Sequence, residues 1–245
     1  MNRTPYPFRD FVRAKETLAQ ALVEIDEVYA MLTGDTGTGK TALLRELSGQ
    51  LDRTRHRVLY FSESRKLGAA GLVKVIGESL RVRSSMCHSV HLDRLLRALS
   101  EESHTILLWL DEAHDLSAET LAEVRALVES DLEGTHRIRV MFIGLPRLRA
   151  EMRAQPYLWR RIVVREEITG LVLDEVQDFL DHHFDATMSK RLCEHGLTTL
   201  FERAGGAPGL LLPMYRAVLA RAGTAGKGKI EPDQVEDILD RWDLA

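Results

Sequence analysis

The residues best suited to chemistry lie between positions 34 and 41, where two glycines separated by four residues are followed by Lys and Thr. A glycine-rich turn lets backbone N–H groups surround phosphate oxygens, and a helix after it directs its positive end at them. In this pattern Lys40 contacts the outer phosphates and the Thr41 hydroxyl binds Mg²⁺. The spacing predicts a nucleotide site formed by Gly34, Asp35, Thr36, Gly37, Thr38, Gly39, Lys40, Thr41 and Ala42.

Two adjacent carboxylates, Asp111 and Glu112, follow the apolar stretch 105–110. This arrangement fits the second signature of nucleoside triphosphatases, in which Asp111 holds Mg²⁺ through water. Glu112 is placed to orient and deprotonate the attacking water. The separation between Lys40 and Asp111 leaves room for one further strand, as in ATPases that use a catalytic Glu. The alternative is a carboxylate pair that merely ends a strand and caps the next helix.

Apolar runs without alternation predict strands buried on both faces of a parallel sheet. They lie at 28–32, 58–61, 106–110 and 140–143, with a shorter fifth at 162–164. Helical patterns alternate with them, which indicates an α/β fold. Their predicted positions are 13–27, 71–80, 92–99 and 118–132.

After residue 170 the sequence predicts helices only, at 173–184, 197–204, 211–222 and 232–242. We therefore expect three parts. Residues 1–27 form an irregular leader and a helix, residues 28–169 an α/β ATPase core, and residues 170–245 a small all-α domain.

Composition restricts the class of protein. With 245 residues, 44% hydrophobic and 29% charged, the chain has the composition of a folded soluble protein. Its net charge of −4 gives no overall attraction to nucleic acid, so such binding requires a local basic patch. Cys87 and Cys193 have no metal-site spacing. We see no secretion signal and no apolar run near the roughly 20 residues of a membrane span, and expect a cytoplasmic protein.

The motifs resemble those of AAA+ ATPases, within the group that contains ExeA, TniB, TnsC and the Mu transposition activator. The stretches that carry the resemblance are 32–41, 108–116, 140–148, 160–162 and 206–209, and it extends over about residues 10–240. It implies a P-loop NTPase (AAA+) three-layer core with a parallel sheet, followed by a small helical lid. It also implies ATPase activity with ATP and Mg²⁺, and homo-oligomers, rings or helical filaments, with ATP between neighbouring subunits.

The resemblance also implies an arginine supplied to the neighbour's nucleotide, a role for which Arg161 and then Arg160 match by position. Alternatively, both are solvated or pair with Glu166 or Glu167.

Two departures from the family pattern matter. Gly144 stands where many AAA+ proteins carry a polar residue at the end of the fourth strand. ExeA-like proteins read Gly-x-Pro-Arg in the lid, where this chain has Gly209. Slow or partner-stimulated hydrolysis is the expected consequence.

Arg65 and Lys66 match, by position, the segment that lies along the DNA backbone in transposition ATPases of this type. Such contacts go to phosphates and carry little sequence information; an exposed basic edge is the alternative. We expect a regulator of DNA transposition that oligomerises on duplex DNA with ATP, recruits a transposase and disassembles on hydrolysis. The alternatives are an ExeA-like ATPase for secretion or envelope assembly, and an AAA+ switch acting on a protein partner without DNA.

Overall fold

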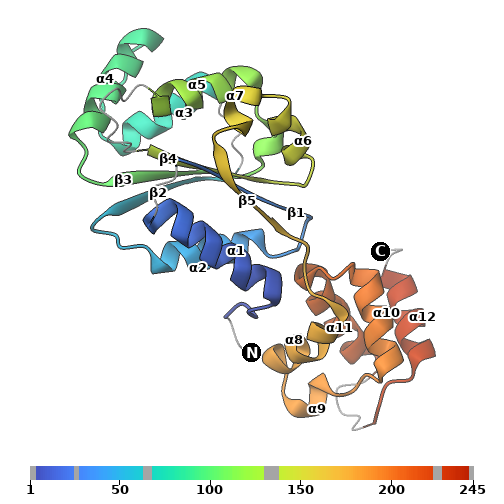
Figure 1. Ribbon diagram of the computed structural model, residues 1–245. Coiled ribbons are helices and arrows are strands. Elements are labelled where there is room, and N and C mark those ends of the chain that lie inside the picture. Colours follow the sequence, from blue (N-terminus) through green and yellow to red (C-terminus); the bar gives the residue numbers. More distant parts are fainter. Residues whose placement is uncertain (1–3, 25–27, 63–67, 130–137, 223–227, 243–245) are drawn as a thin grey trace. The chain divides into compact units, whose positions relative to one another are not determined.

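The computed structural model describes residues 4–24, 28–62, 68–129, 138–222 and 228–242. Its contacts divide the chain into two compact units, each described by itself below (Figure 1). The helical unit comprises Met1–Ala14, Gly34–Leu43 and Ile168–Ala245, and the sheet unit comprises Lys15–Thr33 and Leu44–Glu167. The segment that carries the predicted phosphate site thus groups with the C-terminal helices, and the predicted boundary near residue 170 stays a prediction.

A five-stranded sheet has the order β2-β3-β4-β1-β5. β1 pairs with β4, β4 with β3 and β3 with β2, all in parallel. The strands are β1 (Tyr29–Gly34), β2 (His56–Phe61), β3 (Thr105–Leu110), β4 (Ile138–Gly144) and β5 (Ile162–Ile168). The α/β fold and the five predicted strands are confirmed.

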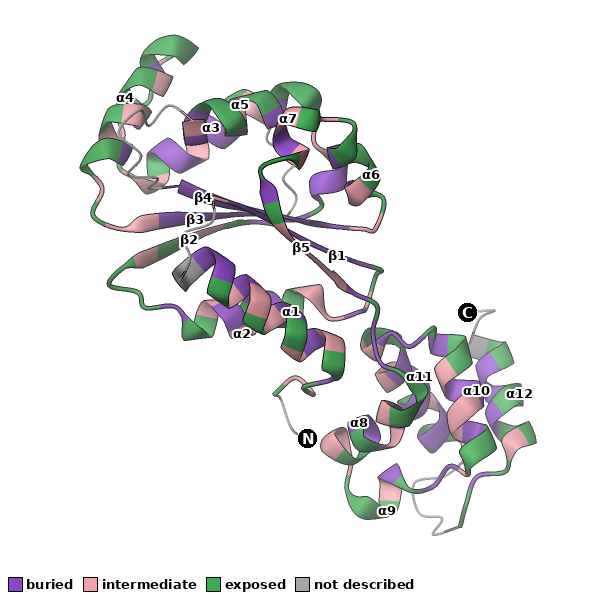
Figure 2. Ribbon diagram, in the orientation of Figure 1, coloured by how far each residue is buried: buried purple, intermediate pink, exposed green. Residues whose placement is uncertain are grey.

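Burial follows the strand order. β1 and β4 are buried at every residue, whereas β2 and β5, at the two edges, are partly exposed (Figure 2). The central strands lack alternation because helices cover both faces of the sheet. Within the sheet unit, the segments of α1 and α2 lie on one face and α3 and α5 on the other (Figure 1). The helices are α1 (Arg9–Ala19), α2 (Lys40–Gln50), α3 (Gly68–Ser79), α4 (His88–Glu101), α5 (Ala118–Glu129), α6 (Leu148–Arg153) and α7 (Pro156–Trp159).

The first helix begins at Arg9 rather than at the predicted residue 13, so the predicted start of this helix was wrong. Pro7 precedes this helix and Asp10 lies in its first turn, where its charge suits the positive end of the helix. A π-helix, Gln20–Glu24, follows α1 directly. Residues 25–27, the end of the predicted helix, lie outside the described residues.

The helical unit confirms the predicted helical C-terminal region. Its helices are α8 (Val176–His183), α9 (Ala186–Ser189), α10 (Glu194–Ala204), α11 (Pro208–Arg221) and α12 (Pro232–Trp242). Their buried side chains, which include Leu180, Leu200 and Tyr215, form a core of their own. In the described part of the chain, no helix has the length and apolarity needed to cross a membrane.

Asp10 joins α1 to the start of the C-terminal segment within the helical unit. Its Oδ2 accepts hydrogen bonds from the backbone N of Thr169 at 3.1 Å and from Thr169 Oγ1 at 2.6 Å, and Arg13 lies 2.8 Å from Oδ1. Partial burial acts to raise the pKa of Asp10, but the hydrogen bonds from Thr169 and the charge of Arg13 outweigh it, so the pKa is lowered. The ionised carboxylate therefore stabilises the fold.

A lowered pKa in the folded state means that this stabilisation is present above the unfolded value, near pH 3.9, and is lost as the pH falls through the folded value. Asp10→Asn is expected to lower the free energy of unfolding by about 1 kcal/mol at pH 7, because charged hydrogen bonds become neutral ones. The difference should be smaller at pH 2 than at pH 7 in urea titrations. Asp174→Asn, at an exposed position, is the matched control. An equal loss at both pH values would contradict this account.

Candidate functional site

The predicted phosphate loop (residues 34–41, called the phosphate loop below) has a backbone that requires glycine at several positions. Gly37 and Gly39 have φ values of 82° and 105°, in the left-handed region that side chains rarely enter. A Cβ at Gly34 would lie 2.5 Å from the carbonyl oxygen of Ile168. α2 begins at Lys40, so its N-terminal turn directly follows the loop. This turn of N–H groups is the physical basis of phosphate binding.

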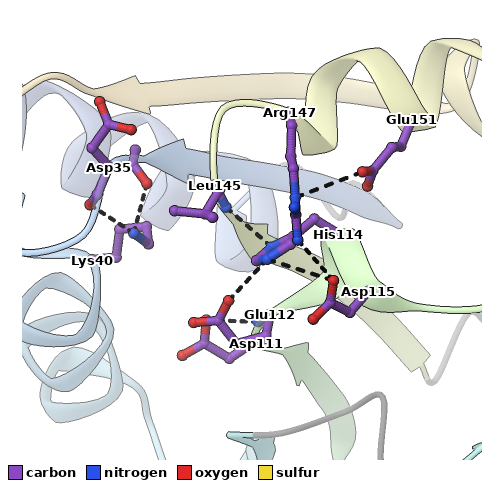
Figure 3. A network of polar contacts seen from close by, with 10 residues as sticks. Asp35, Lys40, Asp111, Glu112, His114, Asp115, Leu145, Arg147 and Glu151 are labelled. Atoms are coloured by element: carbon purple, nitrogen blue, oxygen red, sulfur yellow. Dashed lines mark hydrogen bonds and ion pairs between the residues drawn. The ribbon is translucent and has the colours of Figure 1, made fainter.

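The lysine of the loop is held inside it. Lys40 Nζ donates to the carbonyl oxygens of Gly34 at 2.7 Å and Asp35 at 2.9 Å (Figure 3). Thr38 Oγ1 donates to the Asp35 carbonyl at 2.8 Å and is buried, whereas Thr41 is exposed in the first turn of α2. The loop therefore carries a compact, multiply donating cation beside its backbone N–H groups, which is the donor set that a polyphosphate needs.

Two aromatic residues support the loop from the N-terminal segment. Phe8 and Phe11 are each 3% exposed, with ring centroids 5.6 Å apart. A Cβ built at Gly39 would lie 3.8 Å from Phe8 and 3.9 Å from Phe11. The two rings therefore pack against the phosphate loop.

The N-terminus of α11 contacts the loop directly. The backbone N of Gly209 donates to the carbonyl oxygen of Gly37 at 2.9 Å. A Cβ at Gly209 would lie 2.9 Å from Gly37 Cα and 3.0 Å from its oxygen, both backbone atoms that cannot turn aside. The missing lid arginine thus has a steric reason, because no side chain fits at this position.

In the sheet unit, Asp111 lies at the end of β3 and is 8% exposed. Its Oδ2 accepts from Tyr60 Oη at 2.6 Å, and its Oδ1 accepts from the backbone N of Glu112 at 2.9 Å. Burial and then the hydrogen bond to Asp111 raise the pKa of Tyr60 above its ordinary value. Our sequence interpretation did not include Tyr60, although it comes one residue before the end of β2, the strand that pairs with β3.

Glu112 has a strained backbone. Its φ and ψ are 53° and 37°, in the left-handed region, and such a conformation costs a non-glycine residue about 1–3 kcal/mol. Its side chain is 49% exposed, and Oε2 lies 3.3 Å from Nε2 of His114. Strain of this kind is found where the surrounding structure fixes a functional side chain. His114 was not among the predicted site residues.

The two arginines before β5 differ in their contacts. Arg161 Nη1 lies 2.8 Å from Glu129 Oε1, rather than beside Glu166 or Glu167 as the alternative interpretation had it. Arg160 is exposed and forms no ion pair with any residue in the described ranges.

The predicted DNA contacts Arg65 and Lys66 lie outside the described residues. A basic surface does occur elsewhere in the sheet unit. Arg53, His56, Arg57 and His104 line a cavity of about 440 Å³ beside the start of β2.

A family model described as an AAA domain matches residues 26–152 of this chain. The chain belongs to this family. The matched residues include the phosphate loop, Asp111 and Glu112, so the nucleotide-site motifs lie in the region that defines the AAA domain.

One curated relative is the general secretion pathway protein A of Aeromonas hydrophila, which is 26% identical over 213 residues. The match covers 82% of this chain but 38% of that protein, so this AAA chain spans well under half of its relative's length.

Solved structures share the fold. Cdc6p from Pyrobaculum aerophilum has a TM-score of 0.71 at 20% identity, covering 97% of this chain and 69% of that one. The Aeropyrum pernix ORC1 protein, in complex with DNA, has 0.63 at 19%, covering 96% and 64%. The Thermotoga maritima RuvB Holliday junction branch migration motor has 0.59 at 16%, covering 96% and 68%. At these identities the likeness shows the AAA+ P-loop fold.

The contact between Gly37 and Gly209 gives a prediction for the start of α11. Gly209→Arg, which restores the Gly-x-Pro-Arg pattern, is expected to weaken ATP binding about tenfold. The new side chain must displace the loop backbone, and the loop then presents its N–H groups less well to phosphate. The measurement is ATP affinity by calorimetry, with Leu210→Arg at the neighbouring, exposed position as control. Tighter binding or faster turnover in Gly209→Arg would contradict the steric account.

Proposed function

We propose that this AAA protein binds ATP with Mg²⁺ and hydrolyses it to ADP and phosphate. The observation that carries the proposal is the phosphate loop, with its left-handed glycines and its lysine ammonium held among the loop carbonyls. Backbone N–H groups and Lys40 bind the phosphates. The Thr41 hydroxyl and the Asp111 carboxylate are hard oxygen donors that suit Mg²⁺, and they would hold it. The ion would offset the negative charge of the phosphates.

In the proposed reaction a water oxygen attacks the γ-phosphorus and the bond to the bridging β–γ oxygen breaks. Glu112 receives the proton of the water, and ADP leaves with the bridging oxygen. The half-exposed carboxylate of Glu112 suits this role because water reaches it directly. Tyr60 and the Glu112 amide hold Asp111 in one orientation.

We further propose that subunits assemble so that an arginine of one approaches the ATP of the next. Arg160 and Arg161 remain the candidates. The ion pair with Glu129 occupies Arg161, which favours Arg160. An arginine in this role stabilises the negative charge that develops on the transferring phosphoryl group.

For the biological role, we propose a cytoplasmic, ATP-dependent regulator of DNA transposition that assembles on duplex DNA and contacts a transposase. The stretches 140–148 and 206–209 resemble the group that contains the transposition activators as well as ExeA, and this resemblance supports the role. Fold neighbours that act on or bind DNA, the RuvB branch migration motor and the ORC1 protein in complex with DNA, are consistent with it. Arg65 and Lys66 are the proposed contacts to DNA phosphates.

A secretion or envelope-assembly role is the second candidate. The 26% identity to the general secretion pathway protein A favours it. In that case the assembled AAA chain acts on a protein partner, and duplex DNA has no effect on it.

The deciding experiment uses Glu112→Gln protein with ATP or ADP, imaged by negative-stain electron microscopy with and without long duplex DNA of random sequence. DNA affinity is measured in parallel at several salt concentrations. Assemblies threaded on DNA only with ATP, with affinity falling steeply as salt rises, support the transposition role. Assemblies that ignore DNA favour the secretion role or a protein-partner switch. Dispersed monomers in every sample contradict the shared-site proposal.

A further inference from the structure

The last residue of β4, Gly144, has no side chain, and the imidazole of His114 lies against its backbone. A Cβ at Gly144 would lie 2.8 Å from His114 Nδ1 and 3.3 Å from Leu148 Cδ2. The His114 side chain is 3% exposed. Glycine at position 144 therefore leaves space for the side chain of His114, which belongs to the segment that follows β3.

A backbone hydrogen bond to this imidazole defines its tautomer. The backbone N of Leu145 donates to His114 Nδ1 at 3.3 Å (Figure 3). A backbone N–H can only donate, so Nδ1 must carry the lone pair. In the neutral ring the proton is then on Nε2. Nε2 lies 3.3 Å from Glu112 Oε2 and 3.9 Å from Asp115 Oδ1.

Of these two carboxylates, Asp115 is already engaged. Arg147 Nη2 donates to Asp115 Oδ1 at 2.8 Å, and Arg147 Nε lies 3.8 Å from Glu151 (Figure 3). Glu112 is the nearer acceptor for His114. Among the residues that the structure describes, its half-exposed side chain makes this contact through Oε2 and no such contact through Oε1, the oxygen we assign to water.

We propose that His114 is a positioning residue for Glu112. It donates Nε2–H to Oε2 and thereby fixes the orientation of the carboxylate. Coming from the segment after β3, its imidazole also provides a polar group at the end of β4, where many AAA+ proteins have a polar residue and this chain has Gly144. The inference rests on the proposed ATPase function. Misplacing a catalytic group by about 1 Å can lower a rate by about 100-fold, which sets the size of the expected effect.

Two substitutions separate the hydrogen bond from the Leu145 amide from the contact between His114 and Glu112. His114→Asn keeps an oxygen that accepts from the Leu145 amide but is too short to reach Glu112. His114→Gln places an amide N–H near the position of Nε2. We expect kcat to fall about 100-fold in His114→Asn and less than about tenfold in His114→Gln, with KM and ATP affinity unchanged in both. Wild-type kcat in His114→Asn would overturn the proposal, as would parallel loss of ATP affinity and kcat in both variants.

A double substitution tests the role of Gly144. Gly144→Ala is expected to displace the imidazole and to lower kcat without changing ATP affinity. In a His114→Ala background the added methyl meets no imidazole, so Gly144→Ala should cause no further loss. Additive losses would show that Gly144 acts independently of His114 and would overturn this part of the proposal.

A spectroscopic measurement tests the geometry without any reaction. Nitrogen-15 spectra of the histidine rings in nucleotide-free protein report which nitrogen carries the proton, with His114→Asn used for assignment. We expect the Nε2–H tautomer for His114; the Nδ1–H tautomer would overturn the inference. If wild-type protein does not hydrolyse ATP, the proposed function fails, and this spectrum still decides whether His114 donates from Nε2.

Discussion

Glu112→Gln is expected to bind ATP as the wild-type protein does and to hydrolyse it about 10²–10⁴-fold more slowly. The amide has the shape of the carboxylate, so the left-handed backbone at this position and the contact with His114 are retained. It cannot accept the proton of the attacking water, and general-base catalysis contributes about this factor. Phosphate release under saturating ATP measures the effect.

The matched control is Glu119→Gln, a nearby exposed glutamate at the start of α5. It should leave turnover unchanged. Hydrolysis by Glu112→Gln at the wild-type rate would remove the assignment of Glu112 as the base. Loss of ATP binding together with turnover would instead indicate that the strained segment after β3 had been disturbed.

Lys40→Ala is expected to lower ATP affinity by at least about 100-fold. The ammonium supplies charged hydrogen bonds to phosphate, each contributing about 1.5–3 kcal/mol. Because Lys40 also donates to the carbonyls of Gly34 and Asp35, its removal could loosen the loop itself. Thermal unfolding without nucleotide separates the two effects, since lost phosphate contacts do not change the stability of the free protein.

Arg45→Ala, on the exposed side of α2, is the control for lost positive charge. It should bind ATP within a factor of about two of wild type. Unchanged ATP affinity in Lys40→Ala would contradict the assignment of residues 34–41 as the phosphate loop. This outcome does not depend on the proposed DNA-binding role.

The strands could be predicted, and the glycine turns of residues 34–41 could be expected, because their signals are local. Buried parallel strands need unbroken apolar runs, and the left-handed turns at Gly37 and Gly39 need glycine whatever surrounds them. The start of α1 was predicted too late because the sequence does not show where Phe8 and Phe11 pack. The fold buries both rings, and they lie beside the loop.

Gly144 and Gly209 could be recognised in the sequence only as departures from a family pattern. Their reasons are contacts between residues far apart in the chain, with the imidazole of His114 in one case and the backbone of Gly37 in the other. Arg161 is similar, because nothing in the sequence near it points to Glu129 as its partner. Spacing predicts which residues reach a site, whereas packing decides which side chains remain free to act there.

The hydrogen bond from Gly209 to Gly37 has a thermodynamic consequence for the helical unit. Thermodynamic linkage is reciprocal. If bound ATP changes the affinity of α11 for a partner through this hydrogen bond, then that partner changes the affinity for ATP by the same factor. A protein that grips this helix could thus govern how long the nucleotide stays bound, without touching the nucleotide itself.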